Sequence, residues 1–120
     1  LQVAGAYHSR LMASAQPKLK AALGEIPLHL PSVPVISNVT AQPHHTAGEI
    51  HAKLVEQVTS SVRWEESMRY LLAQGFTRFI ELGPGAALTG FMKRIDKNAT
   101  SFNVNNVATL ESTVAALSAG

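Results

Sequence analysis

Apolar residues recur in five segments of the chain with the three-to-four-residue spacing of amphipathic helices. Pro17 lies inside the first segment and predicts a kink or a late start of that helix, and Gly24 suits its end. Thr46-Ala47-Gly48-Glu49 has the residue order of a capping box, so the second helix is predicted to begin there. The helical apolar positions are Leu11, Ala15, Leu19, Ala22 and Leu23; Ile50, Leu54 and Val58; Trp64, Met68, Leu71 and Leu72; Leu88, Phe91, Met92 and Ile95; and Leu110, Val114 and Leu117.

Short apolar runs near these segments are typical of strands. Between the first two helices, Pro27, Pro31 and Pro34 favour an extended connection. The predicted strands are Leu1–Ala4, Val35–Ile36, Phe76–Leu82 and Ser101–Val104, and the predicted tight turn is Gly83-Pro84-Gly85. Strands that alternate with helices predict an α/β fold with a parallel or mixed sheet. No repeat, linker or change in composition divides the chain into two domains.

The composition is that of a globular domain without disulfides. The chain has 120 residues, of which 46% are hydrophobic and 15% charged, and it contains no cysteine. Its net charge of +2 comes from scattered lysines and arginines, so no nucleic-acid groove is predicted. No apolar run approaches the ~20 residues of a membrane span, and no basic segment precedes an apolar one as in a signal peptide. We expect a cytoplasmic protein, and a chain that starts inside a longer gene product because it opens on strand-like residues without Met.

Three groups of residues offer candidate chemistry. Gly83-Pro84-Gly85 lies between a strand and a helix, where anions bind, but the dinucleotide and phosphate-loop patterns are both missing. His44, His45 and His51 lack the spacing of a metal site, so no metal is predicted. His8 follows a predicted strand and precedes a helix, which is where α/β enzymes place a catalytic base. The chain has no G-x-S-x-G elbow to supply a nucleophile for that base.

Four blocks of sequence together carry more information than any single motif. Each is weakly specific alone, but their order and spacing resemble the C-terminal part of malonyl-CoA:acyl carrier protein transacylase, the acyltransferase of bacterial type II fatty acid synthesis. The resemblance spans nearly the whole chain, up to about residue 96. The blocks are Gly5-Ala6-Tyr7-His8-Ser9-Arg10-Leu11-Met12; Pro34-Val35-Ile36-Ser37-Asn38-Val39-Thr40; Leu54-Val55-Glu56-Gln57-Val58 with Val62-Arg63-Trp64; and Glu81-Leu82-Gly83-Pro84-Gly85 with Leu88-Thr89-Gly90.

This resemblance implies a fold and a missing part. The family has a large α/β-hydrolase-like subdomain that is interrupted by a small ferredoxin-like one. Residues 1–120 resemble the segment that returns to complete the large subdomain, with alternating short strands and helices. The G-H-S-L-G nucleophile elbow, the arginine that grips the malonyl carboxylate and most of the oxyanion hole would then belong to a missing N-terminal part of the same protein. The chain alone is therefore expected to be inactive.

The resemblance also implies a reaction and assigns residues to it. In the family a serine attacks malonyl-CoA, and the pantetheine thiol of acyl carrier protein then collects the malonyl group, without any cofactor. His8 matches the base that activates the serine, and Gln57 matches the residue whose backbone carbonyl holds the second ring nitrogen of that base. Since that carbonyl is neutral, we expect Gln57 to orient the ring rather than to supply charge. The implied partners are malonyl-CoA, acyl carrier protein and the missing part.

Two further residues match positions beside the substrate. Tyr7 matches a bulky aromatic that goes with malonyl in related modular acyltransferases, because such a wall leaves no room for an α-methyl group. Asn38 matches an asparagine near the active site and is expected to support the histidine loop by hydrogen bonds. Ser61 stands where relatives usually have proline, and Arg63 and Trp64 are expected to be structural.

Other functions stay open at this point. A polyketide synthase or malonate decarboxylase acyltransferase would carry similar blocks. A non-enzymatic α/β module that holds an anion at Gly83-Pro84-Gly85 is the alternative from a different class.

Overall fold

The computed structural model describes residues 5–119, which form two compact units. The first unit reaches to Tyr70 and the second begins at Leu71, so the boundary falls inside a helix. The predicted strand Leu1–Ala4 lies outside the described residues. The elements are the 3-10 helix η1 (Arg10–Ala15), α1 (Gln16–Gly24), α2 (Ala47–Glu56), α3 (Trp64–Ala73), β1 (Arg78–Leu82), α4 (Ala87–Ile95), β2 (Thr100–Val104) and α5 (Val107–Ser118).

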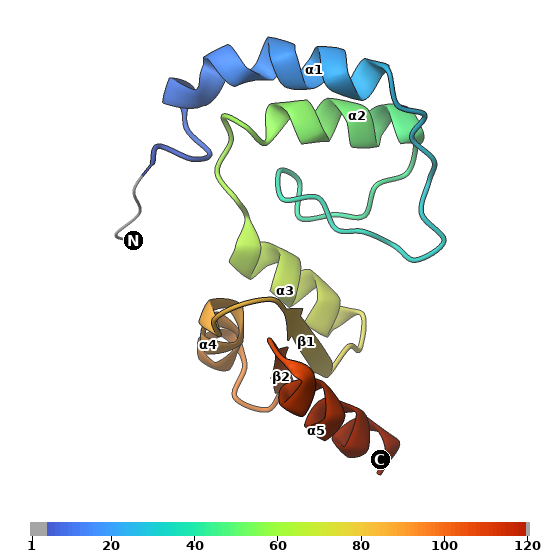
Figure 1. Ribbon diagram of the computed structural model, residues 1–120, viewed down its shortest axis with the longest axis vertical. Coiled ribbons are helices and arrows are strands. Elements are labelled where there is room, and N and C mark those ends of the chain that lie inside the picture. Colours follow the sequence, from blue (N-terminus) through green and yellow to red (C-terminus); the bar gives the residue numbers. More distant parts are fainter. Residues whose placement is uncertain (1–4, 120) are drawn as a thin grey trace. The chain divides into compact units, whose positions relative to one another are not determined.

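In the first unit, α1 and α2 lie side by side and run in opposite directions (Figure 1). Pro17 occupies the first turn of α1, where its missing N–H has no helical partner to lose. The predicted late helix start is therefore confirmed, because residues 10–15 form only a 3-10 helix before it. Gly24 is the last residue of α1, also as predicted.

The start of α2 follows the predicted capping box with one change. The Thr46 side chain accepts a hydrogen bond from the backbone N–H of Glu49 at 3.0 Å. The Glu49 carboxylate reaches back one residue further than in the standard box and accepts from the N–H of His45 at 2.8 Å. Two backbone donors at the beginning of the helix are thus satisfied.

The predicted strand at Val35–Ile36 is wrong. Ile36 forms only an isolated antiparallel bridge with Pro43, and proline cannot donate to a ladder. The chain turns back on itself instead: Ser37 N–H donates to the Gln42 carbonyl at 2.9 Å, and Ala41 N–H donates to the Ser37 carbonyl at 2.9 Å. The loop from 35 to 46 is consequently a compact turn that carries Asn38.

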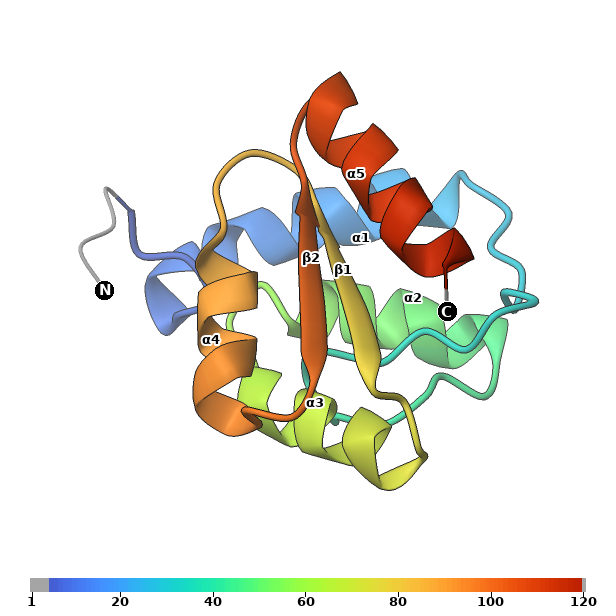
Figure 2. The same ribbon diagram turned by 90° about the horizontal axis from the view of Figure 1, so that it is seen from below.

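The second unit contains a two-stranded parallel sheet flanked by α4 and α5 (Figure 2). The register runs from Arg78 opposite Thr100 to Leu82 opposite Val104. The predicted α/β class with parallel pairing is confirmed. β1 starts two residues later than predicted, because Phe76 N–H still donates to the Leu71 carbonyl in the turn that ends α3.

The core of the described residues is small. Only three apolar side chains within 5–119 are buried, those of Ala41, Met68 and Met92. Many large apolar side chains are exposed instead, including Leu11 at 81% and Leu82 at 77%. An apolar surface of this kind is usually covered by further polypeptide or a partner. No helix in the described part of the chain is long and apolar enough to cross a membrane.

Candidate active site

His8 lies in the loop that leads into η1, and its side chain is exposed. Its backbone has φ +56°, a left-handed conformation that is uncommon for a residue other than glycine. The next residue holds this loop in place, since Ser9 Oγ donates to the Ala6 carbonyl at 2.6 Å and accepts from Leu11 N–H at 3.3 Å. Strained residues of this kind cluster at functional sites, so His8 is marked by its backbone as well as by its side chain.

The His8 ring is hydrogen-bonded to the end of α2. Its Nδ1 lies 2.8 Å from the backbone oxygen of Gln57, the C-cap residue of that helix. A carbonyl can only accept, so Nδ1 carries the proton and Nε2 of the neutral ring keeps a free lone pair. No hydrogen bond joins Nε2 to another residue among those described. The ring is therefore oriented as a base with its basic nitrogen available.

The position of this carbonyl adds an electrostatic effect. Gln57 ends α2, and the last carbonyls of a helix carry the negative end of its dipole. The bond therefore places the His8 ring at the negative end of the α2 dipole, next to a group without formal charge.

Asn38 supports Gln57 rather than His8. Its Nδ2 donates to Gln57 Oε1 at 3.1 Å. Gln57 is thus held twice, by its backbone oxygen on His8 and by its side-chain oxygen on Asn38. The structure brings three of the four predicted site residues into one hydrogen-bonded chain.

Tyr7 lies next to this chain without a hydrogen bond to it in the described residues. Its side chain is exposed and lines a hollow of about 170 Å³ with His8, Met12 and Val58. The ring folds close over Gly5: a Cβ added at Gly5 would lie 2.8 Å from Tyr7 Cε2. Any other residue at position 5 would push the ring away, so Gly5 sets the position of this aromatic wall.

The other two candidate sites were the three histidines and the Gly83-Pro84-Gly85 turn. No group of three His, Cys, Asp or Glu side chains in residues 5–119 is placed to hold a metal. The anion site proposed at Gly83-Pro84-Gly85 has its helix donors in use already. The Glu81 carboxylate accepts from Leu88 N–H at 3.1 Å, and from the N–H and Oγ1 of Thr89 at 2.9 and 2.7 Å. An anion at this turn would have to displace a carboxylate of the protein itself.

Sequence reasoning missed the role of Glu81. The hydrogen bond from the Thr89 side chain is the largest of the effects that lower the Glu81 pKa below its ordinary value of 4.5. Glu81 caps α4 although it lies six residues before that helix begins, beyond the reach of local capping patterns. The signal that could have found it is a carboxylate at a strand end that faces a helix start without a capping side chain of its own.

Known proteins resemble this chain in sequence and in fold. No protein-family model matches the chain. It is 42% identical over 111 residues to a malonyl CoA-acyl carrier protein transacylase of Bacillus subtilis (strain 168), an alignment that covers 92% of this chain and 35% of the relative. The crystal structure of malonyl-CoA:acyl carrier protein transacylase from Xanthomonas oryzae pv. oryzae superposes with a TM-score of 0.89 at 35% identity, over 97% of this chain and 37% of that one.

A second similar structure is that of a type II polyketide synthase acyl carrier protein in complex with its malonyl-transacylase, with a TM-score of 0.86 at 36% identity over 93% of this chain and 36% of that one. The fold is thus that of part of an α/β acyltransferase. Over nearly all of its length the chain is similar to about one third of malonyl CoA-acyl carrier protein transacylases, which confirms the resemblance seen in the sequence.

Proposed function

We propose that this chain is the histidine-bearing part of an enzyme that moves a malonyl group from coenzyme A to the pantetheine thiol of acyl carrier protein through a seryl intermediate. The observation that carries the proposal is the 2.8 Å hydrogen bond between His8 Nδ1 and the Gln57 carbonyl. That bond fixes the tautomer in which Nε2 is basic. The family resemblance implies this contact, and no local sequence pattern would bring together two residues that are 49 positions apart.

In this mechanism His8 Nε2 takes the proton of a serine hydroxyl that attacks the malonyl thioester. The proton then passes to the departing thiolate of coenzyme A. The reverse transfers occur when the pantetheine thiol attacks the malonyl-serine ester. Gln57 holds the ring throughout, at the negative end of the α2 dipole.

Tyr7 and Asn38 have supporting roles in the same proposal. Tyr7 forms the aromatic wall of the hollow beside His8 and restricts the acyl group to malonyl, because an α-methyl group would collide with it. Asn38 holds the Gln57 side chain and contacts the substrate region only through that residue.

The serine and the arginine that binds the malonyl carboxylate are proposed to come from a further part of the same protein. The chain spans about a third of the length of the curated relatives that it matches, and its many exposed apolar side chains are consistent with cover by that part. The chain alone is expected to be inactive. The proposed location is the cytoplasm.

The test uses the full-length protein that carries this chain, with malonyl-CoA and a holo acyl carrier protein, and measures malonyl transfer by mass spectrometry. The wild type is expected to transfer malonyl, and His8→Ala is expected to lower kcat by roughly 10²- to 10⁴-fold. Purified residues 1–120 are expected to show no turnover. A fully active His8→Ala enzyme, or a wild type inert toward malonyl-CoA, would contradict the proposal.

A polyketide-associated transacylase is the second candidate, favoured by the similarity to the transacylase in the polyketide carrier-protein complex. The same assay separates the two, because a polyketide enzyme should prefer the carrier protein of a polyketide synthase to that of fatty acid synthesis. The anion-binding module is not supported, since Glu81 already occupies the donors at the start of α4.

A further inference from the structure

Arg63 lies immediately before α3 and is tied twice to the turn that carries Asn38. Its backbone N–H donates to the Asn38 carbonyl at 2.9 Å. Its guanidinium Nη1 donates to the Thr40 carbonyl at 3.2 Å. One residue therefore holds both ends of the three-residue stretch 38–40.

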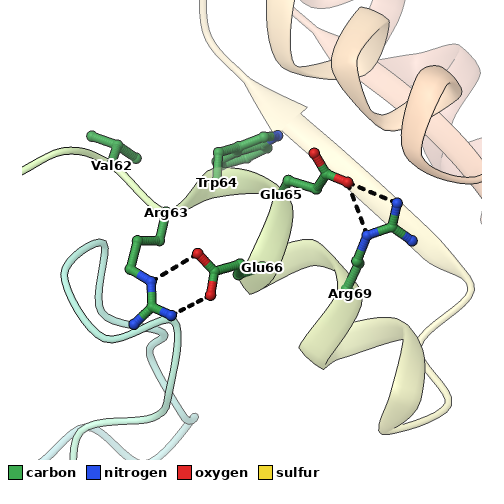
Figure 3. A pocket seen from close by; sticks show the side chains of 6 residues that line it. All are labelled: Val62, Arg63, Trp64, Glu65, Glu66 and Arg69. Atoms are coloured by element: carbon green, nitrogen blue, oxygen red, sulfur yellow. Dashed lines mark hydrogen bonds and ion pairs between the residues drawn. The ribbon is translucent and has the colours of Figure 1, made fainter.

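The guanidinium is itself fixed by Glu66, one turn along α3. Arg63 Nε donates to Glu66 Oε1 at 2.8 Å, and Nη2 pairs with Oε2 of the same carboxylate, so the contact is bidentate (Figure 3). These hydrogen bonds are the main cause of a raised pKa for Arg63 and a lowered pKa for Glu66. Both groups consequently stay charged across the pH range of an enzyme assay, and the planar fork leaves Nη1 aimed at Thr40.

Ser37 also holds the turn at 38–40. Ser37 is buried, with 3% of its surface exposed, and its Oγ accepts from Val39 N–H at 3.2 Å. Ser37 holds the start of the turn, and Arg63 holds the orientation of its backbone. The Asn38 side chain then donates to Gln57 Oε1, and the Gln57 carbonyl holds the His8 ring.

We infer that Arg63 is a positioning residue for catalysis: it holds the 38–40 turn so that Asn38 fixes Gln57, and through Gln57 it fixes the His8 ring. This inference rests on the proposed function, because it needs His8 to be the base. The path runs through four hydrogen bonds in one compact unit, all between described residues.

A contribution to the free energy of unfolding explains the contacts of Arg63 less well than a positioning role does. The Arg63 and Glu66 side chains are 45% and 55% exposed, and exposed ion pairs add little stability because water and salt screen them. The same helix carries a matched pair, Arg69 with Glu65, whose side chains are 59% and 63% exposed. Figure 3 shows both pairs among the six residues that line one hollow. The Arg69 guanidinium reaches only Glu65 among the described residues, so it is the natural control.

The experiment compares Arg63→Met with Arg69→Met in the full-length enzyme, with malonyl-CoA and holo acyl carrier protein as substrates. Arg63→Met is expected to lower kcat by about 10- to 100-fold, the size of a lost hydrogen bond to a charged group. KM for malonyl-CoA is expected to stay unchanged, because no substrate contact is removed. Arg69→Met is expected to leave both constants unchanged, and Arg63→Lys to recover part of the loss through a single bond to Thr40.

Two further readouts separate positioning from simple loss of stability. Nitrogen chemical shifts of His8 are expected to report Nδ1–H in the wild type and in Arg69→Met, and a mixture of tautomers in Arg63→Met. Adding Asn38→Ala to Arg63→Met is expected to cost no more kcat than Asn38→Ala alone, because the two residues act in series.

The inference is overturned if Arg63→Met loses no more kcat than Arg69→Met, if its His8 stays in one tautomer, or if its effect adds fully to that of Asn38→Ala. These failures differ from failure of the proposed function. If the enzyme needs His8 but not Arg63, only this inference is wrong. If the enzyme tolerates His8→Ala, both this inference and the proposed function are wrong.

Discussion

The loop before η1 and the loop before α4 adopt left-handed backbone in different ways. In the loop before η1 the residue with positive φ is His8, at +56°. In the loop before α4 the residues with positive φ are Gly83 and Gly85, at +136° and +82°. Glycine adopts such angles without steric cost, whereas a residue with a Cβ loses of the order of 1–3 kcal/mol. The loop before α4 therefore has glycine at its left-handed positions and is unstrained. The loop before η1 is strained at His8, and this strained backbone positions the His8 side chain.

The two loops also differ in how far their polar groups are hydrogen-bonded. Glu81 fills the donors at the start of α4, so this loop is satisfied from within. Among residues 5–119 the ring of His8 bonds only through Nδ1, to the Gln57 carbonyl. Strain, together with an Nε2 that has no partner in this part of the chain, distinguishes the loop of the proposed base from the loop before α4.

The largest expected effect comes from His8→Gly in the full-length enzyme. Activity is expected to fall by roughly 10²- to 10⁴-fold, as expected for loss of a general base. The melting temperature is expected to stay the same or to rise, because glycine relieves the left-handed strain even though the bond to Gln57 is lost.

His8→Ala is the matched control, since it removes the imidazole and keeps the Cβ. It is expected to be as inactive as His8→Gly and less stable by about 1 kcal/mol. Equal stability of the two variants would show that position 8 is not strained, and the contrast between the loops would fail.

The sequence predicted the regular elements well and the irregular ones poorly. Five helices and two strands close to β1 and β2 follow from apolar spacing and from local signals such as Pro17 and Thr46, whereas the sheet was expected only to be parallel or mixed. The strand at Val35–Ile36 does not form, since its bridge partner is Pro43 and the loop closes through its own backbone. The two-unit arrangement also escaped prediction, because its boundary lies inside a helix without any linker.

For the site, the sequence supplied residue identities through the family resemblance, and the structure supplied the connections. The contact of His8 with the Gln57 carbonyl is present as expected, while their catalytic roles stay predictions. The link of Asn38 to Gln57, and that of Arg63 to Thr40, join residues 19 and 23 positions apart. No local pattern encodes contacts at such distances, since they depend on how the loop from 35 to 46 folds back.

A smaller effect is expected in the second loop from Gly85→Ala. The added Cβ meets no atom within 4 Å, so the cost comes only from φ of +82° and should be roughly 1–2 kcal/mol. Malonyl transfer is expected to stay normal at temperatures below the melting transition. Gly24→Ala is the control, because Gly24 ends α1 with equally open space and no positive φ, and it should not destabilise. Equal melting temperatures for the two variants would contradict the role assigned to Gly85.

The smallest effect concerns Glu81 and depends on pH. Hydrogen bonds from Thr89 and Leu88 lower the pKa of Glu81 below 4.5, so its folded form holds the charged carboxylate more firmly than the unfolded chain does. That contribution to stability is complete above the ordinary glutamate pKa and is lost as the pH falls through the lower pKa of the folded protein.

Glu81→Gln in the full-length protein should therefore melt below the wild type at pH 7, and the gap should narrow as the pH falls below 4.5. Glu111→Gln, an exposed position on α5, controls for the loss of one negative charge. Thermal unfolding at a series of pH values measures both variants. A gap that stayed constant down to the lowest pH at which the protein is folded would mean that Glu81 does not hold the start of α4 through its charge, and the second loop would no longer count as satisfied from within.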